Sequence, residues 1–134
     1  MDEKTFKART KKLAVAIIQQ VEKLPRSFSA NIIAKQLVWS GTSVGANYRA
    51  ACRAKSTPDM INKLKIVEEE GDETAYWLEL LVESGFVRQE QISEIYKEVN
   101  EIVAMTLSSI KTLRNRPPQS QIQNPKSKIV NQKS

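Results

Sequence analysis

The 134-residue chain contains no histidine and one cysteine, Cys52. Histidine is the commonest general acid or base near neutral pH and the commonest metal ligand, so its absence argues against an enzyme and against a metal site. One cysteine cannot form an intrachain disulfide, and its alanine neighbours suggest a small packed side chain. We therefore expect a non-enzymatic protein with no catalytic residue, metal or cofactor. An enzyme that works with carboxylates alone is the remaining catalytic alternative.

Glycine and long apolar runs are also scarce. The four glycines, at positions 41, 45, 71 and 85, form no G-x-G-x-x-G pattern, and no lysine follows them as in a phosphate-binding loop. No segment has the roughly 18 consecutive apolar residues typical of a membrane span, and the first residues are charged rather than of signal-peptide type. We expect a cytoplasmic protein with no membrane partner.

Apolar residues at helical spacing predict an all-α protein with four helices. Pro25 ends the first helix, Thr57-Pro58-Asp59 starts the third with a capping hydroxyl, and Ser84-Gly85 stops it. The expected helices cover about residues 6–24, 27–56, 57–83 and 89–113. Short connections favour an antiparallel up-down-up-down four-helix bundle. We expect this domain at residues 1–116, followed by a disordered basic tail at residues 117–134.

Small and polar residues occupy the middle of the second helix, over Trp39–Asn47, although the apolar stripe continues through them. Gly41 and Gly45 lie one turn apart, so another backbone can approach closely. We interpret the run as a tight helix crossing or an oligomer interface rather than a ligand loop. The residues assigned to it are Trp39, Ser40, Gly41, Ser43, Gly45 and Asn47, with Glu73 and Trp77 from the third helix.

Two expectations concern the neighbours of this run. Asn47 is expected to share a polar contact with the third helix. Tyr76 and Trp77 are adjacent in sequence and cannot lie on one helix face, so one should pack in the core while the other faces a rim or a partner chain.

Charge is segregated along the chain, although the net charge is only +6. Residues 1–67 hold 13 basic and four acidic residues, residues 68–110 hold two and 11, and residues 111–134 hold six and none. The basic half can bind a polyanion such as RNA, or meet the acidic surface of another copy in a ring. Ordinary solvated helix faces, neutralised between adjacent helices, are the third interpretation.

Basic residues of the first half are the candidates for phosphate contacts. Arg49 and Arg53 lie one turn apart, and they are also expected to pair with Glu69 or Glu73 of the third helix. The candidate nucleic-acid-binding residues are Lys4, Lys7, Arg9, Lys11, Lys12, Lys35, Arg49, Arg53, Lys55, Lys63 and Lys65.

Several motifs in a fixed order carry a family resemblance. They are Ala34-Lys35-Gln36-Leu37, the run Ser40–Asn47, Ala54-Lys55-Ser56, Ile61-x-Lys63-Leu64-Lys65-Ile66, and Glu73-Thr74-x-Tyr76-Trp77-Leu78-Glu79-Leu80-Leu81. Over about residues 5–115 the chain resembles the bacterial four-helix bundle proteins named for the 23S rRNA intervening sequence. The resemblance implies a ring-shaped homopentamer. Similar sequences tend to carry Arg where this chain has Trp39. The loss of that cation weakens the expectation of an anion site at this position and suggests that Trp39 is a packing or interface anchor.

Together these observations predict a non-enzymatic, homo-oligomeric four-helix bundle that binds RNA or DNA through phosphate contacts. The alternative is a protein-interaction scaffold, in which segregated charge drives ring assembly and an unknown protein partner docks without any nucleic acid.

Overall fold

The computed structural model describes residues 2–116, so the predicted tail at residues 117–134 lies outside the described residues. Four helices follow one another: α1 (Glu3–Val21), α2 (Phe28–Cys52), α3 (Thr57–Glu83) and α4 (Gln89–Arg114). No strand occurs in the described range, which confirms the all-α prediction. No helix between residues 2 and 116 combines the length and apolar character that crossing a bilayer requires.

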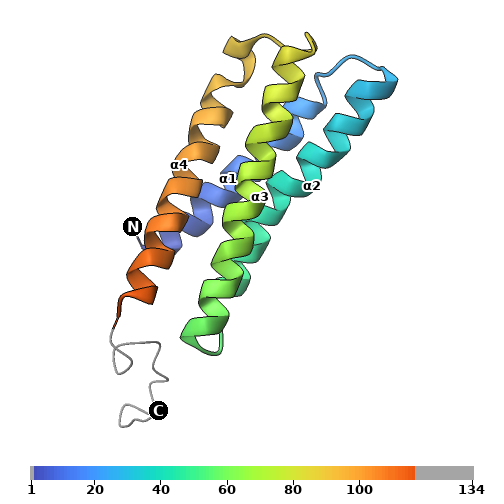
Figure 1. Ribbon diagram of the computed structural model, residues 1–134. Coiled ribbons are helices and arrows are strands. Elements are labelled where there is room, and N and C mark those ends of the chain that lie inside the picture. The colour runs from blue at the N-terminus through green and yellow to red at the C-terminus, as the bar shows by residue number, and fades with distance from the viewer. Residues whose placement is uncertain (1, 117–134) are drawn as a thin grey trace.

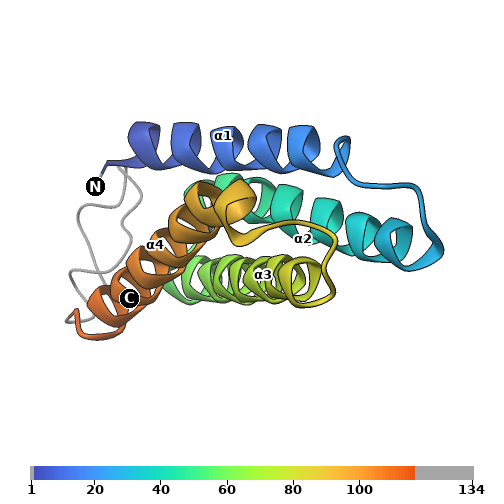
Figure 2. The ribbon, with the colours of Figure 1, turned by 90° about the horizontal axis from the view of Figure 1, so that it is seen from above.

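Consecutive helices run in opposite directions and form an up-down-up-down bundle (Figure 1). α2 packs against α1 and α3, and α3 also packs against α4. α1 and α4 make the smallest helix–helix contact, because α4 runs obliquely to α1 (Figure 2). The seam between α1 and α4 is therefore the least closely packed side of the bundle.

Local capping chemistry explains where the helices begin and end. The Ser27 hydroxyl accepts a hydrogen bond from the Ala30 amide at 3.1 Å and starts α2. Ser56, with extended backbone angles, accepts from the Asp59 amide at 3.1 Å and starts α3, so the cap lies one residue before the predicted Thr57. A residue in that conformation cannot also be helical, which excludes the expected end of α2 near Ser56. α2 ends at Cys52, and Arg53 is its C-cap.

The end of α3 follows the predicted glycine signal. Gly85 has a φ of 82°, a left-handed conformation that favours glycine, and the Phe86 amide donates back to the Leu81 carbonyl at 2.9 Å. This geometry terminates the helix one turn before α4 begins.

Apolar side chains from all four helices form two buried clusters. The larger cluster includes the fully buried residues Leu13, Ile17, Leu37, Val44, Val67, Leu78, Leu81, Val99 and Ile102. The smaller cluster, near the end of α4, consists of Ala51, Leu64, Ile110 and Leu113. Tyr48 packs against both clusters and joins them.

The small residues of α2 face two neighbouring helices. A Cβ atom added at Gly41 would overlap the Ile17 side chain, and one at Gly45 would lie 3.1 Å from the Thr10 Oγ1. α1 therefore approaches α2 closely at both glycines, as the run predicted. The buried Ser40 hydroxyl turns instead to α3, where it lies 3.0 Å from the Thr74 hydroxyl in a hydrogen bond.

Other residues of the run behave differently. The Asn47 side chain donates to the Ser43 carbonyl of its own helix at 2.9 Å, so the expected contact with α3 is wrong. Its amide reaches a backbone acceptor one turn away without crossing between helices. Trp39 is 72% exposed and takes no part in a crossing within the chain. Trp77 packs against the core while Tyr76 is exposed, which confirms that the two aromatics face different environments.

Candidate nucleic-acid interface

A groove between α1 and α2 gathers three of the predicted cationic residues. It has a volume of about 520 Å³ and is lined by Lys7, Ala8, Thr10, Lys11 and Ala14 from α1 and by Thr42, Gly45, Ala46 and Arg49 from α2. None of these lining residues is acidic. The groove thus combines positive charge with a lining of short side chains.

The same small residues that bring the helices together also create the groove. Gly45 packs on Thr10, and alanines at positions 8, 14 and 46 leave the space above that contact open. Long side chains, Lys11 and Arg49 among them, therefore flank a hollow instead of filling it. An extended anionic chain could lie in such a hollow with cations on both sides.

The cations of the groove are available for binding. No ion pair involves Lys11 or Arg49 within residues 2–116. Lys7 contacts Glu3 at 2.8 Å, with both side chains well exposed. An exposed pair at this spacing contributes only about 0.3–0.5 kcal/mol, so a phosphate can compete for Lys7 at little cost.

The outward face of α2 extends this cationic surface. Phe28, Ile32, Lys35, Trp39, Thr42, Ala46, Arg49 and Arg53 alternate at spacings of four and three residues, so they form one strip, which we call the α2 outer stripe. Phe28 is 81% exposed and Trp39 is 72% exposed. The sequence holds no acidic residue between Glu22 and Asp59. Phe28 was not among the predicted site residues, although its spacing of 11 residues from Trp39 places both on one face of a helix.

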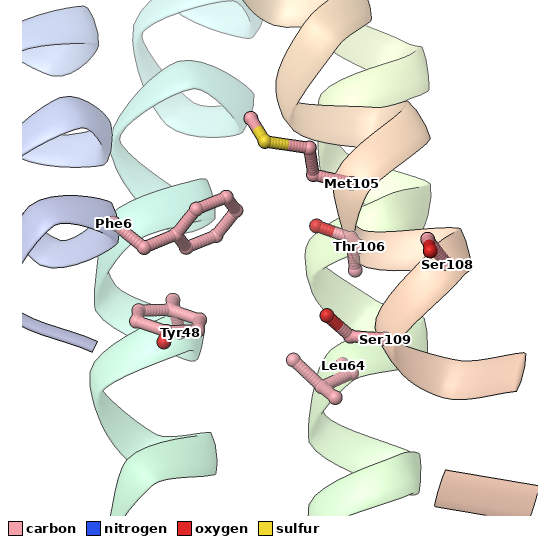
Figure 3. Close-up of a pocket in the computed structure, with 7 residues that line it drawn as sticks. All are labelled: Phe6, Tyr48, Leu64, Met105, Thr106, Ser108 and Ser109. Atoms are coloured by element: carbon pink, nitrogen blue, oxygen red, sulfur yellow. The ribbon is translucent and has the colours of Figure 1, made fainter. Parts of the chain in front are cut away.

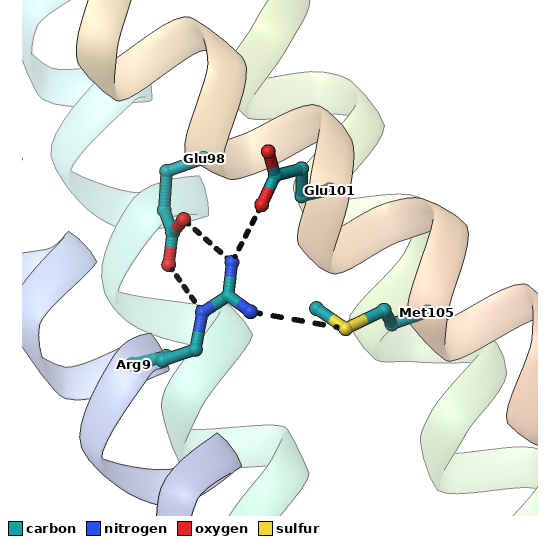
Figure 4. Close-up of polar contacts among 4 residues, drawn as sticks. All are labelled: Arg9, Glu98, Glu101 and Met105. Atoms are coloured by element: carbon teal, nitrogen blue, oxygen red, sulfur yellow. Dashed lines mark hydrogen bonds and ion pairs between the residues drawn. The ribbon is translucent and has the colours of Figure 1, made fainter. Parts of the chain in front are cut away.

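Arg9, a predicted phosphate contact, is held by other residues. Its Nε and Nη2 donate to the two Glu98 carboxylate oxygens at 2.8 and 2.6 Å, and Nη2 also donates to Glu101 at 2.9 Å (Figure 4). Met105 Sδ accepts from Nη1 at 3.8 Å. The hydrogen bonds to Glu98 raise the pKa of Arg9. Arg9 thus joins α1 to α4 and is not free to bind phosphate.

Arg49 and Arg53 do not pair with Glu69 or Glu73, which corrects that expectation. The four ion pairs within the described range are Lys7–Glu3, Arg9–Glu98, Arg9–Glu101 and Lys63–Asp59. α2 turns Ser40 toward α3, and a residue nine positions later lies about half a turn round the helix. Arg49 therefore points away from the acidic helix.

The remaining predicted cations are spread over the surface. Lys63 contacts Asp59 one turn earlier on α3 at 3.4 Å, so it is partly neutralised. The other six predicted cations have exposed side chains and no ion pair within residues 2–116, and they are Lys4, Lys12, Lys35, Arg53, Lys55 and Lys65. Of these, Lys35 and Arg53 belong to the α2 outer stripe.

α3 carries the opposite charge on its outer face. Ile66, Glu69, Glu73 and Tyr76 are exposed at spacings of three and four residues, and we call them the acidic α3 stripe. The neighbouring Glu70 is half-buried, and burial, followed by repulsion from Glu73 and Glu69, raises its pKa. Glu79 accepts a hydrogen bond from the Tyr96 hydroxyl of α4 at 2.6 Å. This surface repels a polyanion and favours a basic partner.

A second hollow lies in the gap beside α4, with a volume of about 170 Å³ (Figure 3). It is lined by Phe6, Tyr48, Leu64, Met105, Thr106, Ser108 and Ser109, none of which is charged. The Phe6 and Tyr48 rings meet edge to face with centroids 4.5 Å apart. Burial and the nearby Cys52 raise the pKa of Tyr48 and so disfavour the charged phenolate. This hollow offers a phosphate no cation.

The described residues contain no cluster of three His, Cys, Asp or Glu side chains able to hold a metal ion. Cys52 is half-buried, and burial raises the pKa of its thiol. A thiol that is protonated at neutral pH is a weak nucleophile and metal ligand.

Comparisons with known proteins agree with the helical architecture. The chain is similar to a protein of unknown function from the S23 ribosomal protein family of Bacteroides thetaiotaomicron, whose crystal structure was determined at 1.70 Å resolution. The two share 38% sequence identity with a TM-score of 0.76, over 83% of this chain and 99% of that one. No curated protein matches the chain significantly. The family model described as 23S rRNA-intervening sequence protein matches residues 4–108, and the chain therefore belongs to that family.

Proposed function

We propose that this protein is a non-enzymatic, self-associating helical bundle of the cytoplasm that binds RNA or DNA through phosphate contacts. The observation that carries the proposal is the groove between α1 and α2, which places Lys7, Lys11 and Arg49 around a lining with no carboxylate. Phosphate contacts of this kind need no base-specific side chain, and they fix the position of the nucleic acid without reading its sequence.

The distribution of charge supports the same proposal. Residues 68–110, which form most of α3 and α4, hold 11 acidic and two basic residues. This surface steers a polyanion away from α3 and α4 and toward the basic α1–α2 side. Lys35 and Arg53 of the α2 outer stripe provide further contacts beyond the groove.

The test measures binding of a fluorescently labelled RNA by anisotropy across a salt series. The Lys11→Gln/Arg49→Gln double variant should bind more weakly, and the slope of log K against log salt should become less negative by about 1.4 for a single strand because two phosphate contacts are lost. Lys97→Gln/Lys111→Gln is the matched control, since it removes the same charge from exposed positions on α4. Equal losses in both double variants, or no RNA binding by the unmodified protein at low salt, would contradict the proposal.

The acidic α3 stripe supports a second candidate function, a scaffold assembled through charge. Exposed Ile66 and Tyr76 beside Glu69 and Glu73 offer apolar area together with negative charge, which suits a basic surface of another copy. A ring of five copies, as the family resemblance implies, is the assembly that we propose. Sedimentation mass that falls with added salt, in a protein without RNA affinity at low salt, would favour the scaffold.

A further inference from the structure

Trp39 is an exposed aromatic residue inside a basic surface. Its neighbour Ser40 contacts Thr74 of α3, and Gly41 packs on Ile17 of α1, so α2 turns Trp39 away from both helices. The side chain is 72% exposed, and Lys35 lies one turn before it on the same strip. A flat apolar ring with a cation beside it is suited to stacking with an unpaired base.

The strip around Trp39 continues into the groove. Arg49 belongs both to the α2 outer stripe and to the groove lining, and Lys11 faces it from α1. At 1.5 Å per residue, Trp39 and Arg49 are separated by ~15 Å along the helix axis. A nucleic-acid strand of a few nucleotides can therefore reach from Trp39 to the cations of the groove.

We propose that the outer face of α2 binds single-stranded nucleic acid, with Trp39 stacking on a base while Lys35, Lys11 and Arg49 contact flanking phosphates. This inference rests on the proposed function and narrows its ligand. In a duplex, both faces of each base are covered by its neighbours, so a convex helix surface cannot stack with them. An unpaired strand exposes its bases, and stacking is tolerant of sequence because every base has a π-face.

The charge of the stripe favours this occupant. Cations at positions 35, 49 and 53 interrupt its apolar residues, and no acidic residue lies between Glu22 and Asp59. A polyanion can contact these cations and the groove cations of α1 together. The competing occupant of the α2 outer stripe is the acidic α3 stripe of a second copy of this chain. The sedimentation mass of Trp39→Ala distinguishes the two occupants.

The experiment compares Trp39→Ala with Tyr76→Ala, which removes another exposed aromatic ring, this one from the acidic α3 stripe. Each protein is titrated into a labelled short oligouridylate and into a blunt RNA duplex of the same length. We expect Trp39→Ala to weaken oligouridylate binding by about tenfold without changing the salt slope, because stacking releases no counterions. Duplex binding should change by less than about twofold, and Tyr76→Ala should change neither.

Two further readouts separate the possible outcomes. Oligouridylate should quench the tryptophan emission of the unmodified protein, and this quenching should disappear in Trp39→Phe. If no form binds either RNA, the proposed function fails and this inference fails with it. If the unmodified protein binds RNA but Trp39→Ala binds equally well, only the inference fails. A lower sedimentation mass of Trp39→Ala would assign the stripe to a second copy and would also overturn the inference.

Discussion

Arg9 of α1 and Glu98 of α4 form a two-bond ion pair across the most open seam of the bundle, with distances of 2.8 and 2.6 Å (Figure 4). The guanidinium and carboxylate planes suit this parallel arrangement, and Glu101 adds a third bond at 2.9 Å. α1 and α4 make the smallest helix–helix contact, so this cluster compensates for limited apolar packing there. A residue that resembles a phosphate ligand in sequence thus stabilises the fold.

Replacing Arg9 by Gln should destabilise the fold. The two side chains of the Arg9–Glu98 pair are 28% and 31% exposed, so solvent screens the pair and we expect a loss of about 1–2 kcal/mol in the free energy of unfolding. Urea denaturation measures it. Lys7→Gln is the matched control, because it breaks an exposed pair on the same helix and should cost less than about 0.5 kcal/mol. Equal losses in the two variants would mean that the Arg9 cluster contributes nothing beyond a surface pair.

Glu70 should lower stability at neutral pH. Its pKa is raised in the folded state, first by burial and then by repulsion from Glu73 and Glu69. The carboxyl is protonated in both states at low pH, so the penalty is absent there and develops as pH rises through the unfolded and folded pKa values. Glu70→Gln should therefore raise the free energy of unfolding at pH 7 relative to the unmodified protein and leave it nearly unchanged near pH 4. If Glu70→Gln raised the free energy of unfolding equally at pH 7 and near pH 4, the gain would come from packing rather than from charge.

The Cys52 thiol should react slowly in the folded protein. It is half-buried, and burial raises its pKa, so little thiolate is present at neutral pH. Labelling with a chromogenic disulfide reagent should be several-fold slower at pH 7 than in urea, and the rate in the native protein should still be rising above pH 9. A native rate at pH 7 that equals the rate in urea would show an open, ionised thiol.

Local signals in the sequence predicted the helix ends well, because capping is decided within a few residues. The serines at positions 27 and 56 and Gly85 act on their own backbone neighbourhood, and each lies where a helix starts or stops. Pro25 placed the end of the first helix about three residues too late, because α1 already ends at Val21. The largest boundary error, at the end of α2, arose because an apolar stripe does not show where the next cap requires extended backbone.

Long-range pairing of charges could not be read from spacing. The partners of Arg9 lie about 90 residues away, and helix periodicity does not state how two helices are rotated relative to each other. The same missing information led to the wrong pairing of Arg49 with α3, and it left open whether Trp39 packs in a helix crossing or is exposed, as its 72% exposed side chain is. Which predicted cations are paired and which are available therefore depends on rotations that only the packed bundle defines. Charge segregation still indicated correctly that α1 and α2 carry the basic surface.

Gly45→Leu provides the sharpest test of the contact on which the groove is built. A Cβ atom at this position would already lie 3.1 Å from the Thr10 Oγ1 and 3.5 Å from the Thr10 carbonyl carbon, so a branched side chain must push α1 away from α2. Overpacking of this kind costs roughly 1–3 kcal/mol, and the better helix propensity of leucine offsets less than 1 kcal/mol of it. Thermal and urea unfolding measure the change.

Ala46→Leu is the control for this variant, because position 46 is exposed and borders the same groove. It should change the free energy of unfolding by less than about 0.5 kcal/mol, and it should weaken RNA binding because the larger side chain occupies the hollow. If Gly45→Leu proved as stable as Ala46→Leu, α1 would not be in tight contact with α2 at Thr10. The contact between Gly45 and Thr10 would then not determine the shape of the groove. The assignment of Lys7, Lys11 and Arg49 to one binding surface would lose its structural basis.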